Sequence, residues 1–165
     1  MKITLNPNAK DAATRDALVA EGGFGKYYTD HMVMCEWSEA DGWGEPHLMP
    51  YGPISLDPAT AVFHYGQEIF EGMKAYRQPD GSIALFRPTA NAKRFANSAK
   101  RLALPEMPVE LFMETVEALV QHDAGWVPNK VGESLYIRPF MIATEVGLGV
   151  RPTNKATYLL IATPA

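Results

Sequence analysis

The sequence predicts an α+β fold in which a mostly antiparallel sheet is covered by two helices. Strand-like segments come first, two helical segments follow as a group, and strand-like segments return towards the end. A tight-turn signal joins two of the early strands, which is typical of an antiparallel hairpin. This order excludes a doubly wound parallel sheet, because that fold needs strands and helices to alternate along the chain.

The chain is expected to begin with an arm and to continue as one domain. Residues 1–25 are polar and carry Gly22, Gly23 and Gly25, so this segment is predicted to drape over the domain before the first firm strand. Residues 26–165 have the length of one ordinary domain with its own hydrophobic core.

The first strands are predicted from composition. Residues 32–37 read Met-Val-Met-Cys-Glu-Trp, a strand-like run. Residues 41–53 are rich in glycine and proline and are expected to be a loop. Residues 61–65 are predicted to form the next strand.

A hairpin is predicted in the middle of the chain. Residues 72–76 and 83–86 have strand composition, and Pro79-Asp80-Gly81 lies between them. Proline followed by aspartate and glycine is a strong turn signal, so the two strands are expected to pair antiparallel.

Two helices are predicted from apolar residues at helical spacing. The first is opened by Pro88 and Thr89 and ends before Pro105, and its apolar residues are Ala92, Phe95, Ala96, Ala99 and Leu102. The second follows Pro108 and ends near Gly125, and its apolar residues are Val109, Phe112, Met113, Val116, Leu119 and Val120. Each can cover a face of the sheet, and segments 134–139 and 157–163 then return to strand composition.

Composition and charge exclude several classes of protein. The chain has 165 residues, is 47% hydrophobic and carries a net charge of −4, with no basic run to bind nucleic acid. It shows no signal peptide and no apolar stretch long enough to span a membrane. The single Cys35 has no partner for an internal disulfide, which favours a reducing compartment, and the cytoplasm is expected. The sequence leaves the role of Cys35 open, and a buried, inert thiol is the simplest interpretation.

The sequence gives little support for a metal site, a nucleotide-binding site or a hydrolase site. The histidines His31, His47, His64 and His122 lie far apart in the sequence, so no metal site is expected. Gly147-Leu-Gly149 begins like a dinucleotide-binding loop, but Pro152 stands where the third glycine belongs. Neither a Gly-x-Ser-x-Gly elbow nor a phosphate-binding loop occurs, which argues against hydrolases and nucleotide-binding proteins.

Segment 64–77, HYGQEIFEGMKAYR, resembles the signature stretch of branched-chain amino acid aminotransferases, which are fold-type-IV pyridoxal-phosphate enzymes. Shorter matches surround it: FG at 24–25, TDHM at 29–32, RP at 87–88, NAKR at 91–94, SLYIRP at 134–139 and GLGV at 147–150. The resemblance runs from about Gly22 to Ala165. It implies that the chain is the small amino-terminal domain of such an enzyme.

By this resemblance the cofactor is pyridoxal 5'-phosphate, and Arg94 binds its phosphate. An arginine suits that task because its planar fork makes charge-assisted hydrogen bonds to phosphate. Without the resemblance, Arg94 reads as a solvated helix residue like its neighbours Lys93, Lys100 and Arg101.

The resemblance also implies a pocket for an aliphatic amino acid. Its residues are Phe24, Tyr65, Phe70, Tyr136, Arg138, Leu148 and Val150. Arg138 would order the carboxylate end of the site through tyrosine hydroxyls, whereas Leu148 and Val150 would reach into the site of a partner subunit, which implies a homodimer. Ordinary sheet core is the alternative for each aromatic residue, and a surface ion pair is the alternative for Arg138.

The resemblance leaves the chain without a catalytic residue. In the family, a lysine of the second domain binds the cofactor aldehyde and moves the substrate proton. None of the eight lysines occupies a matching motif: Lys2, Lys10, Lys26, Lys74, Lys93, Lys100, Lys130 and Lys155. The lysine is therefore expected beyond Ala165, and this chain alone is expected to be inactive. The apolar strand so close to the last residue also predicts that the natural protein continues.

The implied activity is transfer of the amino group of leucine, isoleucine or valine to 2-oxoglutarate, by a ping-pong cycle through pyridoxamine phosphate. A biosynthetic and a catabolic direction are both compatible with the sequence. The alternatives of the same fold are a D-amino acid aminotransferase and an aminodeoxychorismate lyase. From another class, the alternative is a non-catalytic dimerisation or binding module.

Overall fold

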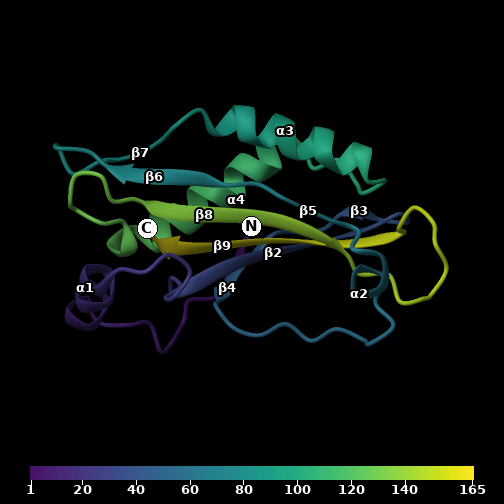
Figure 1. Ribbon diagram of the computed structural model, residues 1–165, viewed down its shortest axis with the longest axis horizontal. Coiled ribbons are helices and arrows are strands. Elements are labelled where there is room, and N and C mark those ends of the chain that lie inside the picture. Colours follow the sequence, from purple (N-terminus) through teal and green to yellow (C-terminus); the bar gives the residue numbers. More distant parts are fainter.

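One mixed sheet, with its two longest helices on one side, forms the protein (Figure 1). The computed structural model describes residues 1–165. The strands are β1 (Lys2–Ile3), β2 (His31–Ser38), β3 (Gly42–Trp43), β4 (His47–Pro50), β5 (Glu68–Phe70), β6 (Met73–Arg77), β7 (Ile83–Leu85), β8 (Leu135–Ala143) and β9 (Lys155–Pro164). The helices are α1 (Ala12–Glu21), α2 (Ala61–Tyr65), α3 (Pro88–Arg101), α4 (Val109–His122) and the short 3-10 helix η1 (Ala124–Trp126).

The strand order is β1-β4-β2-β9-β8-β6-β7, with β3 paired to β2 and β5 paired to β8. Every pair is antiparallel except β1 with β4. This arrangement confirms the predicted α+β class. The predicted hairpin is also present, since β6 pairs with β7 across the turn at Pro79-Asp80-Gly81.

Strands β5 and β6 both pair with β8, one after the other, and a short break separates them. Phe70 pairs with Phe140 and Met73 pairs with Ile137, so the register is the same on both sides of the break. The amide of Glu71 donates to the carbonyl of Pro139 at 2.8 Å, which keeps the break against β8. Because side chains alternate along a strand, Phe70 and Gly72 face one side of the sheet and Glu71 faces the other.

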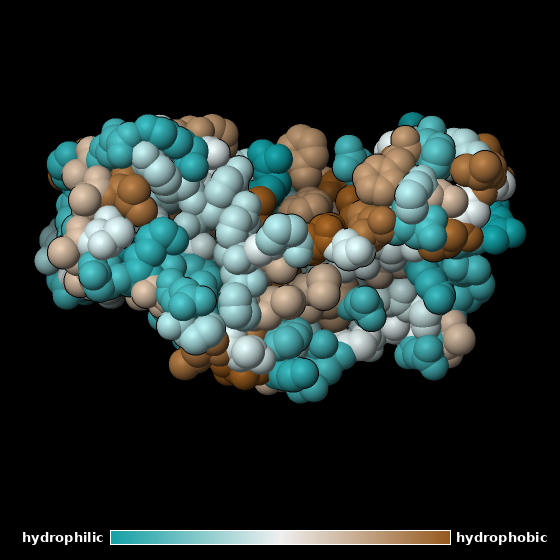
Figure 2. All heavy atoms as spheres, turned by 90° about the horizontal axis from the view of Figure 1, so that it is seen from below, coloured by the Kyte–Doolittle hydropathy of each residue, from teal (hydrophilic) through white to brown (hydrophobic).

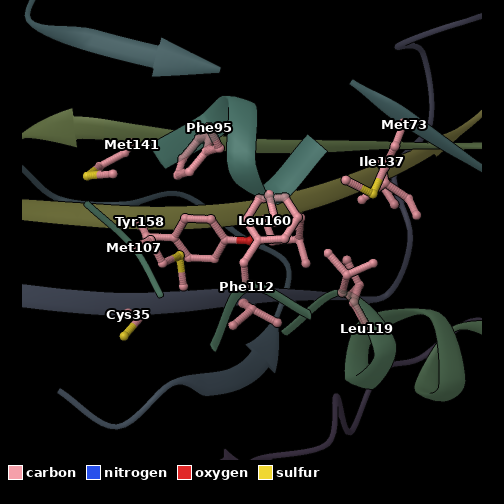
Figure 3. Packing of buried hydrophobic residues seen from close by; sticks show 14 of the residues in the cluster. Cys35, Met73, Phe95, Met107, Phe112, Leu119, Ile137, Met141, Tyr158 and Leu160 are labelled. Atoms are coloured by element: carbon pink, nitrogen blue, oxygen red, sulfur yellow. The ribbon is translucent and has the colours of Figure 1, made fainter. Parts of the chain in front are cut away.

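The core lies between the sheet and helices α3 and α4, which both cover the same face. The rings of Phe95 from α3 and Phe112 from α4 lie 5.7 Å and 6.2 Å from the ring of Tyr158 on β9. Figure 3 shows these three rings together among the buried methionines and leucines of the cluster. The two helices match the sequence prediction, with Pro88 in the first turn of α3 and Pro108 just before α4.

The opposite face of the sheet carries no long helix. Along β8 the side chains of Tyr136, Arg138 and Phe140 point to this face, and they are only partly buried. The segment between β4 and α2 runs along it (Figure 1). We call this side the open face.

Residues 1–25 are more structured than the predicted arm. They form β1 and α1, and Asp11 caps α1 by accepting from the amide of Thr14 at 2.7 Å. The amide of Asn6 donates to Nε2 of His31, whose Nδ1 lies 2.7 Å from Asp123. These bonds join the start of the chain to β2 and to the end of α4. The prediction failed because such contacts are not encoded locally.

Two further predictions were wrong. Residues 61–65 form helix α2 and not a strand, because a short apolar run does not by itself distinguish the two; Gly66 then ends the helix in a left-handed conformation, with φ of 58°. The expected loop 41–53 contains β3 and β4. Its prolines 46 and 50 lie just before β4 and at its last residue, where proline disturbs a sheet least.

None of the helices has the length and apolar composition that a membrane crossing requires.

Candidate functional site

Four of the residues singled out from the sequence form a cluster on the open face. The guanidinium of Arg138 lies 4.4 Å from the centre of the Phe70 ring and donates to the hydroxyl of Tyr136 through Nη2 at 2.8 Å and Nε at 3.3 Å. The ring of Phe24 meets the ring of Tyr136 edge-on at 4.9 Å. Because the Tyr136 oxygen accepts from Arg138, its own hydrogen is free to donate to a ligand.

Gly72 leaves the space in which the Tyr136 ring lies. A Cβ at position 72 would lie 2.3 Å from the Tyr136 hydroxyl and 3.0 Å from Cζ. The glycine is therefore required by this close approach and not by its backbone angles, since its φ is not in the left-handed region.

Arg94 lies on the other side of the same strand segment, where it pairs with Glu71. Its Nε donates to Oε1 of Glu71 at 2.6 Å and its Nη2 donates to Oε2 at 2.7 Å. Asn91, one helical turn earlier on α3, donates to Oε2 at 3.0 Å and to the carbonyl of Gly72 at 3.2 Å. The Glu71 side chain is 4% exposed, whereas that of Arg94 is 67% exposed.

The environment of Glu71 favours its charged form. Burial by itself would raise the pKa of this carboxyl, but the hydrogen bonds from Arg94 and Asn91 outweigh burial and lower the pKa below its usual value. The pKa of Arg94 is raised by the same hydrogen bonds to Glu71. The two groups therefore stay ionised at neutral pH.

Two hollows adjoin Arg94. One, of about 350 Å³, is also lined by the cationic residues Lys74 and Arg87 and by the rings of Tyr76 and Phe86. The other, of about 500 Å³, lies beside Phe70. Three cationic side chains around one hollow suit an anion such as a phosphate, and the two rings offer apolar walls. The donor set present therefore fits pyridoxal phosphate.

The remaining residues singled out from the sequence form a second cluster. The hydroxyl of Tyr65, at the end of α2, donates to the carbonyl of Leu148. Tyr65 and Val150 line one hollow of about 470 Å³. Figure 2 shows apolar residues at the surface of this end of the molecule, where Phe63, Tyr65, Val146, Leu148 and Val150 are exposed.

The loop after β8 is held in shape by a buried carboxylate. Glu145 accepts from both Nε and Nη2 of Arg151 and from the amide of Asn154. These hydrogen bonds lower the pKa of Glu145. The backbone that carries Leu148 and Val150 is therefore fixed at both ends, while their side chains remain 65% and 81% exposed.

The two clusters lie towards opposite ends of β8. Tyr136 is its second residue, and the loop with Leu148 and Val150 follows its last residue, Ala143, about 23 Å further along at strand spacing. Residues expected in one pocket thus form two separate groups within a single chain. Such a division is compatible with a pocket completed by a second subunit.

Sequence reasoning missed the role of Glu71 and Asn91. One signal was present: in a strand, Glu71 shares a face with its neighbours Ile69 and Met73, which are buried. A carboxylate on that face requires a cationic or hydrogen-bonding partner, and Asn91 and Arg94 are three residues apart on the helix that covers it.

The structure gathers no group of three His, Cys, Asp or Glu side chains that could hold a metal ion. The lone Cys35 is buried, at 1% exposed, and its thiol lies 3.3 Å from the carbonyl of Gly44. Burial raises the pKa of this thiol to about 11.

Comparison with known proteins agrees with this picture. No family model matches the chain. It is 57% identical to a probable branched-chain-amino-acid aminotransferase of Streptomyces coelicolor, over 99% of this chain and 46% of the relative. It is also 57% identical to the Mycolicibacterium smegmatis branched-chain-amino-acid aminotransferase, over 99% of this chain and 45% of the relative.

Solved structures have the same fold. The T.th. branched-chain amino acid aminotransferase with pyridoxamine 5'-phosphate superposes with a TM-score of 0.58 at 27% identity, over 78% of this chain and 38% of that chain. The Escherichia coli enzyme superposes with a TM-score of 0.61 over 79% of this chain and 40% of that chain, and at 22% identity it supports the fold alone.

The chain spans slightly less than half the length of the curated relatives it matches. Its identity to them extends over almost all of its own length, and it includes both clusters described above. The chain therefore belongs to the branched-chain amino acid aminotransferase family.

Proposed function

We propose that this chain supplies the substrate-recognition part and a phosphate-binding arginine of a pyridoxal-phosphate-dependent transaminase. Its substrates are leucine, isoleucine and valine, with 2-oxoglutarate as the amino acceptor. The observation that carries the proposal is the segment Phe70–Gly72. Its two outer residues lie in the Tyr136 and Arg138 cluster, and its central residue, Glu71, pairs with Arg94.

In this proposal each cluster has a defined task. Arg94 binds the cofactor phosphate with the N–H groups that Glu71 leaves free. Tyr136, oriented by Arg138, donates its hydroxyl to the substrate carboxylate. The rings of Phe24 and Phe70 cover the aliphatic side chain and keep water from it. The bound cofactor supplies the electron sink that makes the Cα proton of the substrate removable.

The second cluster is proposed to complete the pocket of a neighbouring subunit in a homodimer. Tyr65, Leu148 and Val150 are exposed together in a single chain, and a cluster of exposed apolar side chains is typical of an interface. They lie too far along β8 from Tyr136 to serve the same pocket within one chain.

The lysine that binds the cofactor covalently is proposed to lie in the part of the relatives that this chain does not span. We also propose that the protein works in the cytoplasm, because its one cysteine has no partner for a disulfide.

A substrate panel tests the activity. The complete gene product should transfer the amino group of leucine, isoleucine and valine to 2-oxoglutarate at rates well above those with D-alanine. It should release no product from aminodeoxychorismate. Preference for D-alanine or for aminodeoxychorismate would replace the proposal with one of the two related activities, and absence of cofactor binding would point to a non-catalytic module.

Borohydride reduction tests the position of the lysine. The 165-residue chain is incubated with pyridoxal phosphate, reduced and analysed by peptide mass spectrometry. Weak, scattered labelling is expected. One stoichiometric phosphopyridoxyl-lysine would mean that this chain carries the lysine itself.

Hybrid dimers test the shared pocket. The Arg138→Ala and Tyr65→Ala variants should each be nearly inactive, because each disables one half of every site. After coexpression, half of the dimers are hybrids with one intact site, so about a quarter of the wild-type activity should return. If no activity returns although hybrids form, each pocket is built from one chain.

A further inference from the structure

The proposed phosphate site does not explain why Arg94 has a buried acidic partner, Glu71. Glu71 is an acid beside a residue assigned to bind an anion, so its charge works against that anion. A carboxylate in this place either competes with the phosphate for Arg94 or holds Arg94 for it. The two possibilities predict opposite effects when Glu71 is replaced.

The hydrogen-bond geometry leaves the outer edge of Arg94 free. A guanidinium has five N–H groups, and Glu71 uses the Nε group and one group of Nη2. Both N–H groups of Nη1 and one of Nη2 remain. Those on the outer edge form a parallel fork that matches two phosphate oxygens, so Glu71 and a phosphate can bind Arg94 at the same time.

The burial of Glu71 decides against competition. Its side chain is only 4% exposed, and Asn91 is the one other side chain that donates to its carboxylate. If Arg94 turned away to a phosphate, Glu71 would be left as a buried charge without a cationic partner, which is costly. Arg94 therefore keeps its bond to Glu71 when an anion arrives.

Hydrogen bonds hold Glu71 on two sides. Its amide bonds to β8 through the carbonyl of Pro139, and Asn91 joins the carboxylate to the first turns of α3 and to the carbonyl of Gly72. Arg94, in contrast, is a long and largely exposed side chain that would otherwise sample many rotamers. Holding it in one rotamer before binding removes that entropy cost from the binding step.

We propose that Glu71, assisted by Asn91, is a positioning residue that fixes the guanidinium of Arg94 and presents its outer N–H edge to the cofactor phosphate. This inference rests on the proposed function, because it takes Arg94 as the phosphate ligand. It adds to that function a strand-to-helix contact that presets the phosphate site in the absence of the cofactor.

The test compares the affinities of two probes for the complete protein. Pyridoxal phosphate and pyridoxal differ only in the phosphate, so the dissociation constant of pyridoxal divided by that of pyridoxal phosphate reports the contribution of the phosphate. Titrations followed by absorbance give both constants for the wild type and for the Glu71→Gln, Asn91→Ala, Arg94→Ala and Glu36→Gln variants. Glu36 is the matched control, since it is an exposed acid on strand β2 that lines neither of the hollows beside Arg94.

Glu71→Gln should weaken pyridoxal phosphate binding by between about 10-fold and about 100-fold, by analogy with the loss of a residue that orients a metal ligand. Pyridoxal binding should be unchanged. Asn91→Ala should act in the same direction but less, and it keeps the test usable if Glu71→Gln does not fold. Glu36→Gln should leave the ratio as in the wild type.

Tighter binding of pyridoxal phosphate by Glu71→Gln would show that Glu71 competes for Arg94, and equal weakening of both probes would show a role in folding alone. Either result overturns the positioning role. An unchanged ratio in Arg94→Ala would instead refute the phosphate assignment of Arg94. If Arg94→Ala lowers the ratio and the Glu71 and Asn91 variants do not, only the inference fails.

Discussion

Replacing Gly72 by alanine should push the Tyr136 ring out of the cluster on the open face. The added Cβ would lie 2.3 Å from the hydroxyl oxygen, whereas ordinary contact begins near 3.4 Å. The ring must therefore move by roughly 1 Å, at a cost of about 1–3 kcal/mol for overpacking. The hydrogen bonds from Arg138 to the hydroxyl weaken with it, which places the expected loss near the upper end of that range.

The cost should depend on the tyrosine ring and not on the glycine backbone. In a Tyr136→Ala background the three atoms nearest to the added Cβ are removed, and the φ of Gly72 lies outside the left-handed region. There Gly72→Ala should be neutral or should stabilise the fold by up to about 1 kcal/mol, because glycine weakens the interior of a strand. The sign of the effect is thus expected to change between the two backgrounds.

Urea unfolding followed by tryptophan fluorescence measures the four corners of this cycle. Gly52→Ala is the control, since nothing lies within 4 Å of a Cβ there and its φ is not in the left-handed region. It should change the unfolding free energy by less than about 0.5 kcal/mol. An equal loss from Gly72→Ala with and without the Tyr136 ring would refute the steric argument.

Three further outcomes follow from burial and charge. Phe112→Ala should lower the unfolding free energy by about 3–5 kcal/mol in the same urea assay, because this fully buried ring packs between α4 and the sheet; a loss below about 1 kcal/mol would contradict that packing. Cys35, whose pKa is raised to about 11, should react with a disulfide reagent at about pH 8 only after denaturation, and fast labelling of the folded protein would show that it is accessible. Glu145 has a lowered pKa in the fold, so its contribution to stability is present above its unfolded pKa near 4.5 and is lost as the pH falls through the folded value. Glu145→Gln should therefore flatten the decline of unfolding free energy below pH 4.5, and an unchanged slope would contradict the ion pair with Arg151.

The elements that were predicted correctly are specified by residues within their own segments. Helices α3 and α4 have apolar residues at helical spacing and a proline at or before the first turn. The hairpin of β6 and β7 has a turn sequence with few alternative conformations. The incorrect predictions concern segments that lack such local determinants. Segment 61–65 is too short for its period to be read, and β4 pairs with β1 and β2 despite the prolines around it.

The candidate site was also only partly predictable from the sequence. The motifs named Arg94, Phe70, Tyr136 and Arg138 because their residue types and order match a family. Tyr136 and Arg138 could be assigned to one face, since strand alternation is a local property. That Phe24 packs against Tyr136 required the fold, because the two residues are far apart in the chain.

The sequence by itself determined the fold class, the two helices, the hairpin and the family, because each depends on periodicity, turn chemistry or motif order within a short stretch. The tertiary structure alone decided that both helices cover one face and that Glu71 pairs with Arg94. It also decided that Tyr65, Leu148 and Val150 form a cluster apart from Tyr136. These features depend on strand register and on packing between residues distant in the chain, and no local preference specifies either.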